Sequence, residues 1–420
     1  MKRFLTCFLL CVMLCACTER ATAPREGRRS IGAQPDKIRS ATGPVRLSQA
    51  EALQNWSALY TNHTNKRPHA TLSADAKKID SVSIGKGVSK KGLTLAGPVV
   101  VDKTIYTLDR NFTLQATDLE TGKKLWRNEL ADIQGTTSKS IGLTRYGNTL
   151  FAVAGNGLVI ATDFSGKELW RTDLKALLRS SATVDSGRLF VSSINNELFV
   201  LNTRTGKKLW QHKGEPAVTN LFGMGTPGVH QSIAVMPSTD GRVNAFDVNS
   251  GVMLWTENLW TNKTYNPMLD IPHITSSPVI EGGRVYLVGN AGKSGVYLLE
   301  NGTPIYTLNL GGRETPFVDK NAWYIITNTG KLVALSKDNG AQYWETPLTS
   351  SEKDTPSWYG PVLAGASLVV TSSLGDIIFY DPKTGKEQRR EKRDELYGAP
   401  VFAQGRMILL TTDGDLLIYQ

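Results

Sequence analysis

Hydrophobic and polar positions alternate along most of the chain in short runs that are separated by turn residues. From Pro98 onward, pairs of these runs are broken in the middle by Gly, Asp or Asn, which is typical of β-hairpins. A second pattern follows each pair: an alternating strand, then Asp or Asn, a Thr-Gly-Lys type of turn and a final Leu-Trp. Its clearest copy is NFTLQATDLETGKKLW, residues 111–126. These patterns predict short antiparallel strands throughout residues 78–420.

The second pattern is an internal repeat. Five copies end at Trp126, Trp170, Trp210, Trp255 and Trp344, a weaker copy ends at Tyr306, and one copy has Arg389 in place of the aromatic residue. The chain stops inside an eighth copy that runs from Gly414 to Tyr419. Copies that recur at roughly 40–45 residues, with four short strands each, are typical of β-propeller blades. The sequence therefore predicts an all-β fold, an eight-bladed β-propeller over residues 78–420.

The repeated residues have structural explanations. Asp or Asn before the turn can bind the turn amides, Gly can take the positive φ, and a Trp ring can fill the wedge between blades. We assign this structural role to Trp126, Trp170, Trp210, Trp255 and Trp344. The last unit lacks an outer strand after Gln420, whereas residues 79–84 (IDSVSI) alternate before the first blade. We expect this N-terminal strand to join the last blade and close the ring.

The first residues resemble a bacterial lipoprotein signal. Lys2 and Arg3 precede an apolar stretch, residues 4–16, that is too short to span a bilayer. The stretch ends in Leu14-Cys15-Ala16-Cys17, which resembles a lipobox. All four cysteines lie within the first 17 residues, so the fold has no internal disulfide, and acylation would remove a stray thiol. We predict a signal peptide over residues 1–16 and lipidation of Cys17, with palmitate among its acyl chains; an ordinary cleaved signal is the alternative.

Charge and composition separate the next segment from the propeller. The net charge is +10, yet residues 1–77 contain 12 Lys or Arg against 5 Asp or Glu, so the remainder is nearly neutral. Residues 17–77 are rich in Pro, Gly, Ser, Thr, Asn and Arg and have little periodicity. We predict a flexible periplasmic tether over these residues. An exported chain with a nearly neutral body is not expected to bind nucleic acid.

The sequence shows no catalytic pattern. The five His residues have no metal-ligand spacing, and no nucleophile elbow, P-loop or dinucleotide-binding glycine pattern occurs in a suitable context. The repeated carboxylates lie in turns between outer strands, where propeller geometry directs them away from the axis. We therefore predict that the chain is not an enzyme and has no cofactor and no metal.

The spacing Ala116-x-Asp118-x-x-x-Gly122-x-x-x-Trp126 resembles the tryptophan-docking repeat of dehydrogenases that use pyrroloquinoline quinone (PQQ). The catalytic members resemble one another in a disulfide between adjacent cysteines, which this chain lacks after Cys17. The lipobox, tether, length and eight blades instead resemble the BamB family, lipoproteins of the machinery that assembles outer-membrane β-barrels. The resemblance covers roughly residues 55–420.

That resemblance implies a non-catalytic scaffold protein. Its members bind the POTRA region of BamA in the BAM complex and aid folding and insertion of outer-membrane proteins. Thr18, in place of Asp, favours the outer membrane and its periplasmic face in some Gram-negative bacteria. We expect a monomer by itself; in one variant of this hypothesis the blade edges receive unfolded outer-membrane strands. The alternative is a quinoprotein-like or other small-molecule-binding periplasmic propeller.

Two loops are the candidate partner-binding site. Family contacts come from blade-connecting loops in the middle of the chain, and the interval from Trp255 to Tyr306 is the longest between copies. Large apolar side chains on such a loop favour an interface, although they could instead fold back over the propeller face. The candidate residues are Val218, Asn220, Leu221, Phe222, Trp260, Tyr265, Asp270 and His273.

Overall fold

The repeat pattern becomes a ring of four-stranded sheets in the computed structural model, which describes residues 38–420. Positions 61, 89–94, 134–140, 218–220, 222, 261–270, 351 and 353 are not described. The predicted signal peptide, Cys17 and the first part of the predicted tether lie outside the described residues. The part of the chain that is described contains no helix long and apolar enough to cross a membrane.

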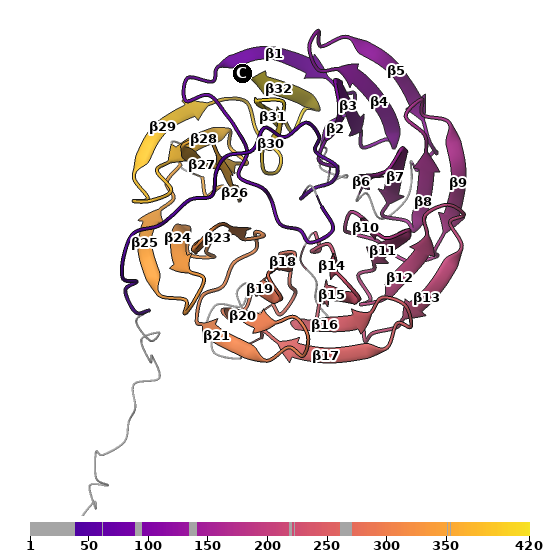
Figure 1. The fold of residues 1–420 in the computed structure, drawn as a ribbon. Coiled ribbons are helices and arrows are strands. Elements are labelled where there is room, and N and C mark those ends of the chain that lie inside the picture. The colour runs from indigo at the N-terminus through magenta and orange to yellow at the C-terminus, as the bar shows by residue number, and fades with distance from the viewer. Residues whose placement is uncertain are drawn as a thin grey trace, which may run out of the picture. The chain divides into compact units, whose positions relative to one another are not determined.

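The described strands form eight antiparallel sheets, blades 1 to 8, and each sheet has its first strand nearest the ring axis and its last strand at the rim (Figure 1). Blades 1 to 4 are β2 (Val99–Val101), β3 (Thr104–Leu108), β4 (Thr113–Asp118), β5 (Lys124–Glu129); β6 (Ile141–Tyr146), β7 (Thr149–Ala154), β8 (Leu158–Thr162), β9 (Glu168–Asp173); β10 (Thr183–Asp185), β11 (Arg188–Ser192), β12 (Leu198–Asn202), β13 (Lys208–His212); β14 (Gly228–His230), β15 (Ile233–Pro237), β16 (Arg242–Asp247) and β17 (Met253–Asn258). Blades 5 to 8 are β18 (Val279–Glu281), β19 (Arg284–Val288), β20 (Ser294–Leu298), β21 (Pro304–Leu308); β22 (Phe317–Val318), β23 (Ala322–Ile326), β24 (Lys331–Ser336), β25 (Gln342–Pro347); β26 (Trp358–Ala364), β27 (Ser367–Ser372), β28 (Asp376–Tyr380), β29 (Glu387–Lys392); β30 (Val401–Ala403), β31 (Arg406–Leu410), β32 (Asp415–Tyr419) and β1 (Lys78–Ser83). The predicted eight-bladed propeller is confirmed.

The ring closes through the strand that comes before the first blade. β1 pairs antiparallel with β32, and Val82 lies opposite Leu416 in this pairing. The last blade is therefore built from both ends of the propeller sequence, as the alternating residues 79–84 predicted. Its backbone hydrogen bonds hold the first and last units together without a disulfide.

Burial falls from the inner strands to the rim. In β7 five of the six residues are buried, whereas in β5 five of the six are exposed. Inner strands are covered by neighbouring blades on both faces, which explains their nearly continuous apolar sequence. The fourth strands have one neighbour within their sheet, and their mixed, charged sequence matches that position.

The repeated Trp residues dock each blade onto the next. The indole Nε1–H of Trp210 donates to the carbonyl of Val248 in the following blade at 2.9 Å, and Trp255 donates to Leu299 at 2.8 Å. The ring of Trp210 packs on Gly251, whose φ of 72° lies in the left-handed region and where an added Cβ would approach the ring to 2.7 Å. The Trp and the turn glycine of the repeat therefore form one joint between blades.

Arg389 stands where the other copies have an aromatic residue, and the closure explains it. The outer strand of blade 8 comes from the N-terminal side, so the turn that a Trp would contact is absent there. Instead, Arg389 lies 3.9 Å over the ring of Phe379 and donates to the carbonyls of Ala74 and Ala76 at 3.1 Å each. The guanidinium thus fastens the chain just before β1 to blade 7.

Residues 38–77, named the strap here, are not the flexible tether that their composition predicted. The Trp56 side chain is fully buried. The backbone N–H of Trp56 donates to the carbonyl of Val100 at 2.8 Å, and the backbone carbonyl of Trp56 accepts the N–H of Val100 at 2.9 Å. Ala70 is also buried and donates to Leu363 at 3.1 Å. The strap has no periodicity because it adds isolated contacts to many blades instead of forming one strand or helix. Figure 1 shows it crossing the front of the ring.

The strap covers one face of the ring, the face where the first and second strands of each blade turn. Arg145 donates its N–H to Ser57 at 2.6 Å, Val229 to His63 at 2.6 Å, and Ile280 to Thr64 at 2.9 Å; these contacts lie in blades 2, 4 and 5. Because successive strands are antiparallel, the loops that connect one blade to the next emerge at the opposite face. That face is the one that carries both candidate loops.

Candidate partner-binding surface

The candidate loops are neighbours on the face opposite the strap. The first loop, residues 213–227, joins β13 to β14, and the second loop, residues 259–278, joins β17 to β18. They connect blades 3, 4 and 5, so both follow the rim strand of one blade and return to the axis strand of the next. Consecutive blade connections on a ring are brought side by side by the fold itself.

Part of the predicted site can be located. The structure describes Leu221, Trp260 and His273. The remaining candidate residues lie outside the described residues: Val218, Asn220, Phe222, Tyr265 and Asp270. Of the located residues, Leu221 is half-buried, Trp260 is exposed and His273 is buried. The three located residues therefore differ in exposure, from the exposed Trp260 to the buried His273.

His273 connects the two loops. Its Nδ1 accepts the backbone N–H of Leu221 at 2.8 Å, and its ring is fully buried. Among the described residues its buried Nε2 has no hydrogen-bond partner. The sequence placed His273 among the partner contacts, whereas the structure gives its side chain no accessible surface. The backbone N–H of Leu221 needs a hydrogen-bond acceptor where water cannot reach it, and His273 supplies that acceptor. His273 therefore holds the first loop in position.

Arg179 completes this connection from the loop between blades 2 and 3. Its guanidinium donates to the carbonyl of Leu221 at 3.1 Å, so both backbone groups of Leu221 are held by side chains. Burial, and then the nearby positive charge of Arg179, lower the pKa of His273 to about 4. The imidazole is therefore neutral near pH 7, as an acceptor at Nδ1 must be.

Two asparagines anchor the same loops and were missed in the sequence. Asn196 donates to the carbonyl of Glu215 in the first loop at 2.7 Å, and Asn290 donates to Ile271 in the second loop at 2.8 Å. Both are buried in the turn between the second and third strands of a blade. The turn asparagine that begins the third copy, Asn196, was visible in the sequence, whereas Asn290 precedes its copy, which begins at Gly295, and the repeat gave no signal for it.

Trp260 presents its ring at the start of the second loop. The side chain is 38% exposed, and its backbone N–H is held by Asn258 at 2.9 Å. Trp260 also forms a β-bridge with Gly292, which fixes the backbone from which the ring projects. An exposed Trp on a fixed backbone loses little conformational entropy when it is buried by a partner.

Side chains of the strap enter the ring from the other face. Arg67 is buried, lies 4.6 Å over the ring of Tyr60 and donates to the carbonyl of Pro361 at 3.3 Å. The Glu314 carboxylate accepts the N–H of Gly360 at 3.3 Å, and burial raises its pKa to about 7, although the charge of Arg67 opposes the shift. The strap thus supplies an aromatic and a cationic side chain to the interior of the ring.

These interior residues do not fit the cofactor of the catalytic propellers. A calcium-bound quinone needs a planar slot and a set of oxygen ligands for the metal. Within the described part of the chain, no group of three or more His, Cys, Asp or Glu is placed to hold a metal ion. Arg67 also covers the face of Tyr60 on which a planar group could stack.

Comparison with known proteins shows what the chain is similar to. A family model described as outer membrane protein assembly factor BamB matches residues 110–346. The chain is 26% identical to the BamB of Escherichia coli strain K12 over 379 residues, which covers 80% of this chain and 86% of that protein. It is 22% identical to the BamB of Yersinia pestis over 351 residues, covering 81% and 88% of the two chains.

Solved structures share the fold. The crystal structure of BamB from Moraxella catarrhalis matches with a TM-score of 0.68 and 18% identity, over 82% of this chain and 99% of that one. A quinohemoprotein alcohol dehydrogenase from Comamonas testosteroni matches with a TM-score of 0.67 and 13% identity, over 88% and 81%. At these identities the likeness concerns the propeller alone, a fold that the assembly factor BamB and an alcohol dehydrogenase share.

Proposed function

The chain belongs to the family of the outer membrane protein assembly factor BamB, and from that membership we propose that it is a non-catalytic scaffold lipoprotein of the outer-membrane β-barrel assembly complex. In this proposal it binds the POTRA region of BamA and so aids folding and insertion of outer-membrane proteins. The relatives that span most of the chain are named as assembly factors, which supports a binding role.

One observation supports the proposed binding site: a hydrogen bond between Leu221 and His273 joins the two candidate loops, and the second loop also carries the exposed Trp260. The strap occupies the opposite face, so the loop face is the one left for a partner. A loop backbone that is held by hydrogen bonds before binding loses less conformational freedom when a partner binds.

The proposed lipid anchor connects to this arrangement through the strap. Ser40 and Ala41 contact Gln342 in β25, so the described chain begins at the rim of blade 6. At about 3.3–3.6 Å per residue, the 21 residues from Cys17 to Ile38 span at most about 75 Å. An ordered strap therefore shortens the reach expected of a 60-residue tether and would keep the propeller near the outer membrane.

A pair of matched variants tests the binding site. Trp260→Ala should weaken binding of the full chain to the purified POTRA region of BamA by about tenfold or more, since buried aromatic anchors dominate interface energies. Leu125→Ala is the control, because Leu125 is 54% exposed on the rim strand β5 of blade 1, away from the loops. Calorimetric titration gives both affinities. Equal affinities for the two variants would remove the loops from the binding site.

The lipidation proposal has a separate test. Metabolic labelling with radioactive palmitate should mark the wild-type chain and leave a Cys17→Ser variant unlabelled, since no other cysteine follows position 17. Fractionation should then place the wild type with the outer membrane and release the variant. An unlabelled wild-type chain would contradict lipidation and support an ordinary cleaved signal peptide.

A further inference from the structure

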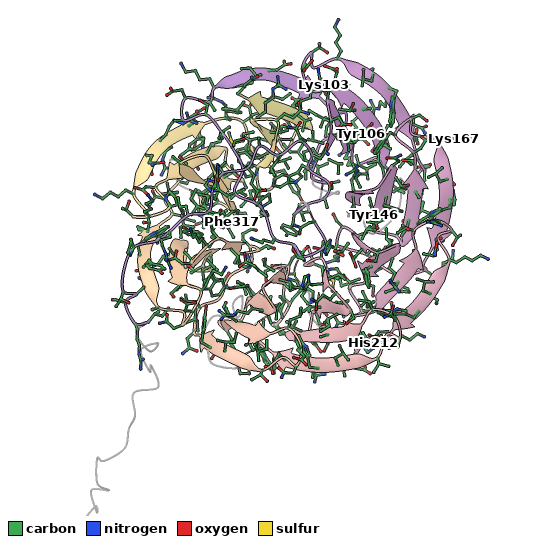
Figure 2. The ribbon with its side chains drawn as sticks, in the orientation of Figure 1. Lys103, Tyr106, Tyr146, Lys167, His212 and Phe317 are labelled. Atoms are coloured by element: carbon green, nitrogen blue, oxygen red, sulfur yellow. The ribbon has the colours of Figure 1, made fainter. Side chains whose placement is uncertain are left out.

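A cavity of about 330 Å³ lies between the strap and the propeller. Strap residues 57–60, 62, 63 and 65 form one side, and the first strands of blades 2 and 3 form the other, with Thr226 ahead of blade 4. The size is within the range of small-ligand sites. Figure 2 shows Tyr146, which lines the cavity, on the inner side of the blade 2 strands. The cavity is on the strap face; of the two candidate loops, only Thr226 at the end of the first one lines it, and Trp260 and His273 do not.

The strap side of the cavity is held in a fixed turn. Asn62 accepts the backbone N–H of Thr64 at 3.1 Å and the Thr64 hydroxyl at 2.8 Å. Asn65 has a φ of 57° and donates to the carbonyls of Thr226 and Pro278 at 3.2 and 3.0 Å. A side chain amide that bridges two blades fixes this wall of the cavity, so the space is built by the fold and does not depend on a mobile side chain.

Arg145 is the permanently charged residue of the cavity lining, and His63 lies 3.8 Å from the carboxylate of Asp185, which does not line the cavity. The lining includes Arg145 and His63, and no Asp or Glu is among the described residues that line it. The buried Nε of Arg145 has no hydrogen-bond partner in the described chain, and its Nη1 reaches the Ser57 hydroxyl only at 3.5 Å. Arg145 as a whole is half-buried, so its guanidinium borders the cavity with one long hydrogen bond to the protein and can donate to an acceptor there.

We propose that this cavity binds a small organic carboxylate. Arg145 would donate to the carboxylate through the planar fork that suits such groups, and the Thr144 and Thr183 positions provide polar walls. Leu59 and Val184 line the same space and give an apolar contact for the organic part. The inference goes beyond the scaffold role, because it concerns another face and another class of ligand.

Benzoate and benzamide test the proposal on the full wild-type chain. The two probes share a ring and size, but only benzoate carries the charge that Arg145 would bind. Saturation-transfer NMR and calorimetric titration should show saturable binding of benzoate, and about tenfold or weaker binding of benzamide. Absence of saturable benzoate binding at tens of millimolar, or equal binding of the two probes, would overturn the proposal.

Substitutions of Arg145 test whether benzoate binds in the cavity. Arg145→Gln should lower the benzoate affinity about tenfold or more, whereas Arg145→Lys should retain part of it. Arg188→Gln is the matched control, because Arg188 is a nearby arginine in blade 3 that does not line the cavity. Unchanged affinity in Arg145→Gln would contradict the assignment. POTRA binding should be unaffected in all three, so failure here is distinguishable from failure of the scaffold proposal.

Discussion

Replacing Trp56 with alanine tests whether the strap is part of the folded propeller. The Trp56 side chain is fully buried, and its ring lies 6.4 Å from the ring of Phe402, centroid to centroid. Removing a buried Trp typically costs about 3–5 kcal/mol. The indole Nε1 has no hydrogen-bond partner among the described residues, and losing this unsatisfied group returns about 1–3 kcal/mol. With about 4 kcal/mol lost on removing the ring and about 1–2 kcal/mol returned by removing the N–H, the expected net loss is about 2–3 kcal/mol.

Hydrogen exchange measured by mass spectrometry is the assay. The N–H groups of Trp56 and Ala70 are bonded to propeller carbonyls, so peptides that contain them should be protected in the wild type. A loss of about 2–3 kcal/mol corresponds to roughly 30- to 150-fold faster exchange across the strap in Trp56→Ala. Blade peptides far from the strap should change less.

Trp56→Phe is the matched control, since it keeps an aromatic ring and removes only the unsatisfied N–H. We expect its exchange to remain within about 1 kcal/mol of the wild type. Strap peptides that exchange as fast as an unfolded chain in the wild type would refute the reasoning. The same conclusion would follow if Trp56→Ala and Trp56→Phe exchanged equally slowly.

Three further changes have defined outcomes. Gly251→Ala should lower the urea-unfolding free energy by about 1–3 kcal/mol, because the added Cβ meets Trp210 at a positive φ. Arg389→Leu should increase hydrogen exchange just before β1, since the bond to Ala76 is lost. The pKa of His273 is about 4 in the folded chain against 6.5 when unfolded, so the free energy of unfolding is highest above pH 6.5 and falls as the pH is lowered from 6.5 toward 4. His273→Asn should remove about 3 kcal/mol of this pH-dependent change in the free energy of unfolding, measured by urea titration at several pH values.

The propeller could be predicted because each blade repeats the same local chemistry. The Asp or Asn, Gly and Trp of each copy specify a turn and a joint to the next blade, so one copy read correctly predicts the others. The closing strand was recognisable for the same reason, because residues 79–84 alternate and the last unit lacks its rim strand. Arg389 broke the pattern, and only the position of the chain before β1 explains it.

The strap and the support of the loops could not be predicted, because their contacts are single and long-range. Trp56 and Arg67 lie in a polar segment without periodicity, and each contacts a blade distant in sequence. His273 was expected at a surface, but the buried amide of Leu221 that it binds is 52 residues away. Trp260 could be proposed from the sequence because a large aromatic residue on a long blade connection is unusual whatever its neighbours are.

The most direct test of the scaffold proposal is face-specific photo-cross-linking to the POTRA region of BamA. A photoreactive amino acid is placed at Trp260 on the loop face, or at Arg46, which is exposed on the strap face. The full chain is then irradiated with its partner in solubilised membranes. The account predicts a cross-linked product from position 260 and none from position 46. A product from position 46 alone, or equal products from both positions, would contradict it.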